Sequence, residues 1–149
     1  MITLTERLEE QAAASDTLTL PYASRIRSRL RVRLDSGREA ALRLQRGVVL
    51  HAGDRLAAED GTVIEVRAAV ERVSTGHTDD RLLLARASYH LGNRHVPLQV
   101  TAAWVRYQHD HVLDAMLERL GLVVLQEMAP FQPESGAYAG SGHVHAHAH

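Results

Sequence analysis

The chain has 149 residues, of which 45% are hydrophobic and 4% aromatic, and its formal net charge is −1. This length suits one domain or two small ones, and the charge gives no case for nucleic-acid binding. The sequence contains no cysteine, which excludes thiolate metal sites, disulfides and cysteine nucleophiles. No apolar run approaches the ~20 residues of a membrane span, and the N-terminal residues lack a signal-peptide apolar region. We therefore expect a soluble, cytoplasmic protein that binds neither nucleic acid nor membrane.

The first half of the chain has the pattern of β structure. Residues 1–16 are predicted to be weakly helical or irregular, and the β pattern begins at Leu18. Apolar residues alternate with arginines over 29–34, which predicts a half-buried strand with a charged outer face. Turn signals separate further predicted strands at 40–44, 48–50 and 62–66, the last after the hairpin signal Asp60-Gly61. Residues 1–72 are therefore predicted to form an all-β, partner-binding domain.

Helical and strand patterns alternate in the second half. Acidic caps at 78–80 and at Asp110 predict two helices, and these helices stop at Gly92-Asn93 and at Gly121. Predicted strands lie at 70–74, 96–100, 104–107 and 122–125. The order β-α-β-β-α-β is that of a ferredoxin-like domain, expected over residues 73–138 as a metal-binding and dimerisation domain. Residues 139–149 are predicted to be a flexible, His-rich tail, so the fold class is α+β.

Each predicted domain is small, and this bears on the oligomeric state. Domains of this size bury a limited fraction of their surface and are marginal alone. We therefore expect the chain to form a homodimer.

The end of the chain carries the strongest compositional signal. Histidine recurs at every second position, at His143, His145, His147 and His149. Short His-rich tracts bind metal ions, although an expression tag is an alternative explanation. A disordered tail of about ten residues reaches roughly 18 Å, so it can fold back and add ligands to a site on the body.

His109 and His111 flank Asp110 where a predicted strand meets a predicted helix. On extended backbone the two imidazoles would share a face and could meet one ion, whereas on a helix they would diverge. The alternative is that Asp110 caps the helix and both histidines are solvated neighbours. The spacing alone does not decide between these possibilities.

His95 follows the predicted helix stop, beside Arg94. One histidine cannot hold a metal ion, but an isologous contact in a twofold dimer brings the same residue from both chains together. Two His95 rings and two tails would supply four or more nitrogens, and without the dimer His95 is a structural residue. Imidazole ligation suits Ni²⁺, Cu²⁺ and Zn²⁺, and binding should weaken below the ordinary histidine pKa of about 6.5.

Two sequence blocks together resemble one family. The first runs from Ala87 to Leu98 and contains Gly-Asn-Arg-His, and the second runs from Arg106 to Leu113 and contains Tyr-Gln-His-Asp-His. The chain resembles the urease accessory protein UreE family at these blocks, and the resemblance extends over essentially the whole chain. It implies a nickel metallochaperone that helps assemble the dinuclear nickel centre of urease.

The resemblance also implies residue roles and partners. His95 matches the interfacial nickel ligand of the family, and His109 and His111 match a secondary metal site of some relatives. The implied partners are a second copy of the chain, the accessory GTPase UreG and the urease apoprotein complex. The tail is short, which argues against a large storage capacity for nickel.

Two other classes of function are weighed against this interpretation. A metal-dependent hydrolase needs an open metal position and a placed base, and the sequence has no His-Glu-x-x-His motif. We therefore do not expect an enzyme. A histidine-based metal buffer or storage protein without a specific recipient is the alternative, and it predicts several weak, similar sites and no complex with a GTPase.

Overall fold

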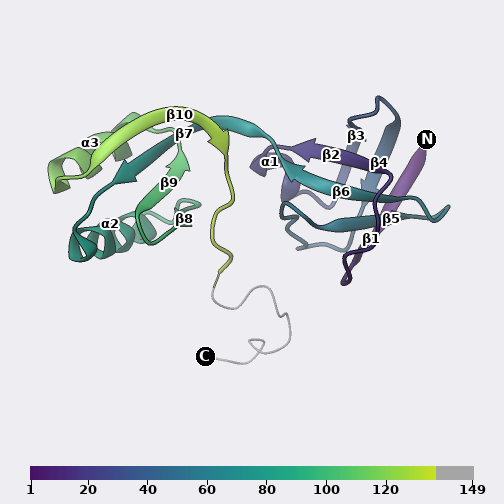
Figure 1. The fold of residues 1–149 in the computed structure, drawn as a ribbon, viewed down its shortest axis with the longest axis horizontal. Coiled ribbons are helices and arrows are strands. Elements are labelled where there is room, and N and C mark those ends of the chain that lie inside the picture. Colours follow the sequence, from purple (N-terminus) through teal and green to yellow (C-terminus); the bar gives the residue numbers. More distant parts are fainter. Residues whose placement is uncertain (137–149) are drawn as a thin grey trace. The chain divides into compact units, whose positions relative to one another are not determined.

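A computed structural model of the chain describes residues 1–136, and these residues form two compact units (Figure 1). The first unit contains Met1–Glu71 and Ala129–Gln132, and the second contains Arg72–Met128 and continues from Pro133. The predicted tail over 139–149, with its four histidines, lies outside the described residues. No helix in the described range is both long enough and apolar enough to span a membrane.

The first unit is built on a six-stranded sheet with the order β2-β6-β5-β1-β4-β3 (Figure 1). Its elements are β1 (Ile2–Leu8), β2 (Asp16–Leu20), the short helix α1 (Tyr22–Arg25), β3 (Arg29–Arg33), β4 (Glu39–Arg43), β5 (Arg55–Ala58) and β6 (Val63–Ala68). The sheet is mixed: β1–β4 and β2–β6 pair in parallel, whereas the other neighbours pair antiparallel. Alternate residues of the strands bury apolar side chains on one side, because successive side chains of a strand point to opposite faces. The resulting core contains Leu4, Leu18, Leu42, Leu50, Leu56, Ile64 and Val66.

A buried arginine ties the late segment Ala129–Gln132 into the first unit. Arg25 is only 1% exposed. Its guanidinium donates hydrogen bonds to the carbonyls of Leu20 (2.9 Å), Leu50 (3.2 Å) and Phe131. Burial lowers the pKa of Arg25, and the nearby Glu71 carboxylate opposes this effect. The hydrogen bonds satisfy a buried charge that would otherwise be costly.

The second unit follows the element order strand, helix, strand, strand, helix, strand. Its sheet has the order β10-β7-β9-β8, and β9 pairs antiparallel with both β7 and β8. The elements are β7 (Val70–His77), α2 (Arg81–Asn93), β8 (Gln99–Val100), β9 (Trp104–Gln108), α3 (His111–Leu120) and β10 (Val123–Pro130). A second core joins the helices to the sheet through Leu84, Ala87, Leu91, Val105, Tyr107, Leu113 and Leu117.

Local sequence fixes where the two long helices begin and where α3 ends. The Asp80 side chain accepts hydrogen bonds from two backbone N–H groups of the first turn of α2, at 3.0 and 3.2 Å. Asp110 does the same for α3, at 2.8 and 3.2 Å. Such caps satisfy donors that the helix itself cannot. Gly121 ends α3 with φ at 112°, a left-handed conformation that favours glycine.

The α+β class with an N-terminal β unit is confirmed, but two local predictions are wrong. Residues 1–16 are not helical or irregular throughout, because β1 lies inside the sheet between β4 and β5. No strand forms at 48–50, where the Leu50 N–H instead donates to the Arg25 carbonyl at 2.9 Å. The buried side of α2 consists of Leu84, Ala87 and Leu91, whereas Leu82 and Tyr89 are 57% and 66% exposed.

Candidate metal site

His95 lies in the connection between α2 and β8, and its side chain is exposed. Its backbone φ is 57°, and no other non-glycine residue in the described range has a positive φ. The His95 N–H donates to the Gly92 carbonyl at 3.0 Å, which holds this left-handed conformation after the helix. A side chain in that region carries a penalty of roughly 1–2 kcal/mol relative to the right-handed region. Strained backbone of this kind clusters at functional sites.

His109 follows the last residue of β9 and is held far more closely. Its backbone N–H donates to the Arg72 carbonyl at 3.2 Å. Its ring Nδ1 lies 3.1 Å from the Ser74 Oγ and 3.3 Å from Asp114 Oδ2. The His109 side chain is 18% exposed, so most of the ring is covered while part of it still reaches the surface.

Asp114 is the centre of the polar network that holds His109. It lies in the first turn of α3 and is 6% exposed. The Tyr107 hydroxyl donates to Asp114 Oδ1 at 2.7 Å, and the Gln126 amide donates to Oδ2 at 3.3 Å. Burial, together with this hydrogen bond to Asp114, raises the pKa of Tyr107 above its usual range. The carboxylate therefore has polar partners from two strands besides the imidazole.

The network has a chemical consequence for the imidazole of His109. A carboxylate only accepts hydrogen bonds, so Asp114 beside Nδ1 favours the tautomer with its proton on that nitrogen. The lone pair is then on Nε2. Metal-binding histidines have this arrangement, in which a carboxylate orients the ring through the nitrogen that does not bind the ion.

His111 has a different environment from His109. It is the first residue of α3 and is exposed. Asp110 between the two histidines has extended backbone, with φ −155° and ψ 115°, and it serves as the helix cap. Asp110 therefore caps α3, which is one of the possibilities that the sequence left open.

A small pocket links the segment after His95 to the segment of His109. Its volume is about 190 Å³. Val96 and Pro97 line one part, and His109 and Asp110 line another. Two sequence blocks that are separate along the chain thus contribute to one depression in the second unit.

Among the described residues, no group of three or more histidine, aspartate and glutamate side chains is arranged to hold a metal ion. His95, His109 and His111 are thus not assembled within one chain into a complete site. His143, His145, His147 and His149 lie outside the described residues.

The sequence analysis missed Ser74, Asp114 and Gln126 as partners of the candidate ligand. The sequence gives only a weak signal that Asp114 belongs to the site, because an acid in the first turn of a helix is already explained by its favourable interaction with the helix dipole. Ser74 and Gln126 lie on β7 and β10, distant in sequence from His109, and no local pattern connects them with it.

The fold and the candidate site define an α+β protein of two units, rich in sheet, whose possible ligands are imidazoles carried by the second unit. Two family models match this chain: the N-terminal domain of the UreE urease accessory protein over residues 3–69, and its C-terminal domain over 62–149.

Several curated proteins named urease accessory protein UreE are similar over nearly the full length. The relative from Alkalilimnicola ehrlichii is 59% identical, with 99% of this chain and 100% of the relative covered. The relative from Pseudomonas putida strain W619 is 57% identical, over 96% of this chain and 89% of its own. The relative from Citrobacter koseri is 53% identical, over 100% and 99%. The chain belongs to the UreE family of urease accessory proteins.

Proposed function

We propose that the protein is a nickel metallochaperone that takes part in urease maturation. In this proposal, Ni²⁺ is cargo: histidines at the interface of a homodimer bind it, and the protein donates it during assembly of the dinuclear nickel site of urease. The proposal rests on membership of a family named for urease accessory proteins together with the environment of His95.

His95 carries the proposal because the left-handed residue that ends α2 does not need to be a histidine. Glycine would adopt the same φ of 57° without a penalty. A histidine retained there, with its ring exposed, is explained by a need for the imidazole at that point. The absence of cysteine excludes thiolate ligands.

The homodimer follows from the ligand count. A single His95 ring is insufficient for a tight site, and a twofold interface would double it. Large apolar side chains of the second unit are exposed, among them Tyr89 at 66% and Val112, next to His111 in the chain, at 49%. A partner copy would cover such side chains.

We infer that the second unit is a ferredoxin-like, metal-binding and dimerisation domain over residues 73–138. The element order β-α-β-β-α-β supports this, as does the sheet order in which the first strand of the unit lies between its last and third strands. Residues 1–72 would then be a partner-binding β domain, and residues 139–149 a His-rich tail.

Three kinds of histidine would act together in this mechanism. His95 from each copy forms the tight site, and His143, His145, His147 and His149 complete the shell and exchange readily. His109 and His111 form a secondary site, to which His109 contributes Nε2. Ligands on an exposed surface can be replaced one at a time by those of a receiving protein, whereas a closed cage would retain the ion.

The proposed setting is the cytoplasm, with the GTPase UreG and the urease apoprotein complex as recipients. The protein would act without catalysing a reaction, as the accessory role of its relatives suggests. Zn²⁺ or Cu²⁺ is expected to bind the same histidines in vitro, because imidazole accepts all three ions.

The test is a calorimetric titration of the purified chain with Ni²⁺, with the mass in solution measured in parallel. We expect one tight ion per dimer and weaker sites that disappear when 143–149 are deleted. His95→Ala should weaken the tight site by more than about 100-fold, or about 2.8 kcal/mol. His77→Ala removes an exposed imidazole from the end of β7 and is the matched control, expected to leave the tight site unchanged.

Two outcomes would contradict the proposal. If His95→Ala kept the wild-type stoichiometry and affinity, His95 would not be the ligand. If all sites were weak and all were lost with the tail, the protein would be a metal buffer without a specific recipient.

A further inference from the structure

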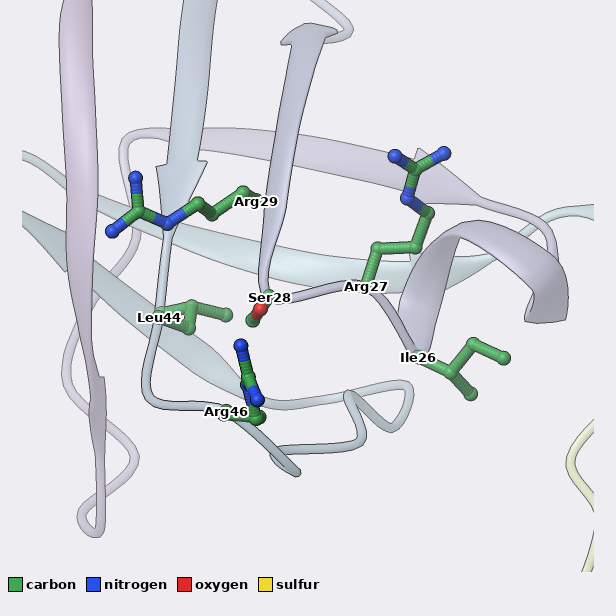
Figure 2. A pocket seen from close by; sticks show the side chains of 6 residues that line it. All are labelled: Ile26, Arg27, Ser28, Arg29, Leu44 and Arg46. Atoms are coloured by element: carbon green, nitrogen blue, oxygen red, sulfur yellow. The ribbon is translucent and has the colours of Figure 1, made fainter.

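The first unit contains a pocket of about 470 Å³ whose lining is strongly basic (Figure 2). It lies where the turn after α1 enters β3 and where the chain leaves β4. Its lining residues are Ile26, Arg27, Ser28, Arg29, Leu44 and Arg46. A hydrogen bond from the Leu44 N–H to the Ser28 carbonyl, 2.8 Å long, joins the two segments at the pocket. The two segments that carry the basic side chains of the pocket are thus hydrogen-bonded to each other.

Within residues 1–136, the arginines around this pocket have no acidic side chain as an ion-pair partner. Arg27, Arg29 and Arg46 are exposed, and none forms an ion pair with another residue in the range 1–136. Other arginines of the same unit do pair with acids, as Arg38 does with Asp60 at 3.6 Å. The basic charge at the pocket is therefore available to an external partner.

The basic surface extends from the pocket along β3 and β4. Arg29 lies directly opposite Arg43 in the β3–β4 ladder, and like charges in that position are unfavourable. Arg31 shares the outward face with Arg29, because alternate residues of a strand point the same way. Leu30 and Val32, which alternate with these arginines, pack against the core. We call the outward surface of Arg27, Arg29, Arg31, Arg43 and Arg46 the arginine face.

The backbone next to the arginine face is also available for pairing. β3 is the last strand in the sheet order and pairs with β4 alone among the described strands. An edge strand presents unpaired N–H and C=O groups that an extended peptide can join. The positive charge of the arginine face and the unpaired edge of β3 therefore both favour an acidic, extended peptide at this surface.

We propose that the arginine face binds an acidic, extended segment of a partner protein. The segment pairs with the free edge of β3, and its carboxylates meet the guanidinium groups. One apolar side chain of the segment enters the pocket against Leu44 and against Ile26, which is 46% exposed. This proposal goes beyond nickel binding and does not depend on any histidine.

The arrangement favours an acidic peptide over a single small anion or a nucleic acid. In Figure 2 the guanidinium groups of Arg27, Arg29 and Arg46 are spread around Ser28 and do not converge on one point. Separated carboxylates suit that spread. No aromatic side chain is among the lining residues of this pocket, so it offers no stacking platform for bases.

The test uses the full chain and three labelled probes, with binding followed by fluorescence anisotropy. The first probe is a ten-residue peptide of alternating glutamate and leucine, the second replaces each glutamate by glutamine, and the third is a single-stranded oligonucleotide of equal charge. We expect the acidic peptide to bind most tightly and to weaken as salt is raised, since surface charges are screened.

Two triple variants, each of which loses three positive charges, test where the acidic peptide binds. Arg27→Gln/Arg29→Gln/Arg46→Gln should weaken the acidic peptide roughly tenfold, by loss of several modest ion pairs. Arg67→Gln/Arg86→Gln/Arg119→Gln removes three exposed arginines elsewhere and should change it less than about twofold. Arg46→Glu alone, at an exposed turn position, tests the same face if the triple variant does not fold.

Three results would overturn the proposal: equal binding of the glutamine peptide, equal loss in the control triple variant, or tighter binding of the oligonucleotide. A Ni²⁺ titration of the first triple variant should match the wild type. Failure of peptide binding is thereby distinguished from failure of the nickel proposal.

Discussion

His95 and His109 belong to the same unit, yet they are held in opposite ways. His95 is exposed and has a left-handed backbone, and in the described range its only hydrogen bond is from its own N–H to Gly92. His109 is mostly covered, with Nδ1 beside both Ser74 and Asp114. At His95 the backbone is constrained and the ring is exposed, whereas at His109 buried polar groups orient the ring.

The difference suggests different tasks for the two positions. A ring that is exposed and unsupported can form and lose a metal bond with little rearrangement around it. A ring beside a buried carboxylate is oriented by it, and such a partner raises the basicity of the nitrogen that binds the ion. Under the proposed function, His95 belongs to the tight interfacial site, whose exposure lets a receiving protein replace its ligands, and His109 belongs to the secondary site.

The largest expected effect comes from removing the carboxylate that holds His109. Asp114→Ala leaves the buried Tyr107 hydroxyl and the Gln126 amide without this acceptor. We expect a loss of about 3 kcal/mol in the free energy of unfolding, measured by urea unfolding at fixed protein concentration. The secondary metal site should weaken about 10–100-fold in a Ni²⁺ titration, while the His95 site is kept.

Asp114→Asn separates the two roles of this residue, because an amide oxygen can still accept from Tyr107. It should cost less than about 1.5 kcal/mol and still weaken the secondary site. Glu118→Ala removes an exposed acid from the same helix and should change neither quantity. Normal secondary metal binding in both Asp114 variants would show that the His109 ring needs no orientation.

The Tyr107 hydroxyl, which contacts Asp114, should make the stability of the protein depend on pH in the alkaline range. Burial and the contact with Asp114 raise the pKa of its hydroxyl, so the folded state keeps this proton after the unfolded state has lost it. Stability from this group is fully present below the unfolded pKa of about 10 and is lost as pH rises above it. The free energy of unfolding should then fall by up to about 1.4 kcal/mol per pH unit.

The measurement is urea unfolding at a series of pH values from about 8 to 11. Tyr107→Phe should remove the slope that this residue contributes and lower stability by about 1–2 kcal/mol at neutral pH. Tyr89→Phe, at a tyrosine that is 66% exposed, is the control and should keep the slope. An unchanged alkaline slope in Tyr107→Phe would mean that another group is responsible.

Local signals predicted much of the second unit. Residues 78–80, Asp110 and Gly121 were predicted as helix boundaries from residue type and position, and the structure has boundaries there, with Asp80 as the cap of α2. These signals succeed because a cap or a stop acts through hydrogen bonds within a few residues. The hairpin of β3 and β4 around Gly37 was predicted for the same reason.

Long-range pairing explains what local signals missed. β1 alternates apolar and polar residues weakly, and it becomes a central strand only through pairing with β4 and β5 much later in the chain. Arg25 is buried because three carbonyls satisfy it, and two of these, from Leu50 and Phe131, lie far from it along the chain. Ser74 and Gln126 join the candidate site in the same way, from β7 and β10, whose positions the sequence near His109 does not specify.

The smallest expected effect, about 1 kcal/mol, tests the strain at His95 directly. His95→Ala keeps a side chain at φ 57°, whereas His95→Gly relieves the left-handed conformation. The glycine variant should therefore be more stable than the alanine variant by about 1 kcal/mol in urea unfolding. Both variants lack the imidazole and should lose the tight nickel site equally.

This pair of variants separates backbone strain from ligand loss. If glycine were no more stable than alanine, the conformation at His95 would carry no strain, and the argument that histidine is retained against a penalty would fail. If glycine is more stable, the wild-type chain accepts a less stable connection between α2 and β8 in order to present an imidazole there. Metal binding would then be the property that explains the residue.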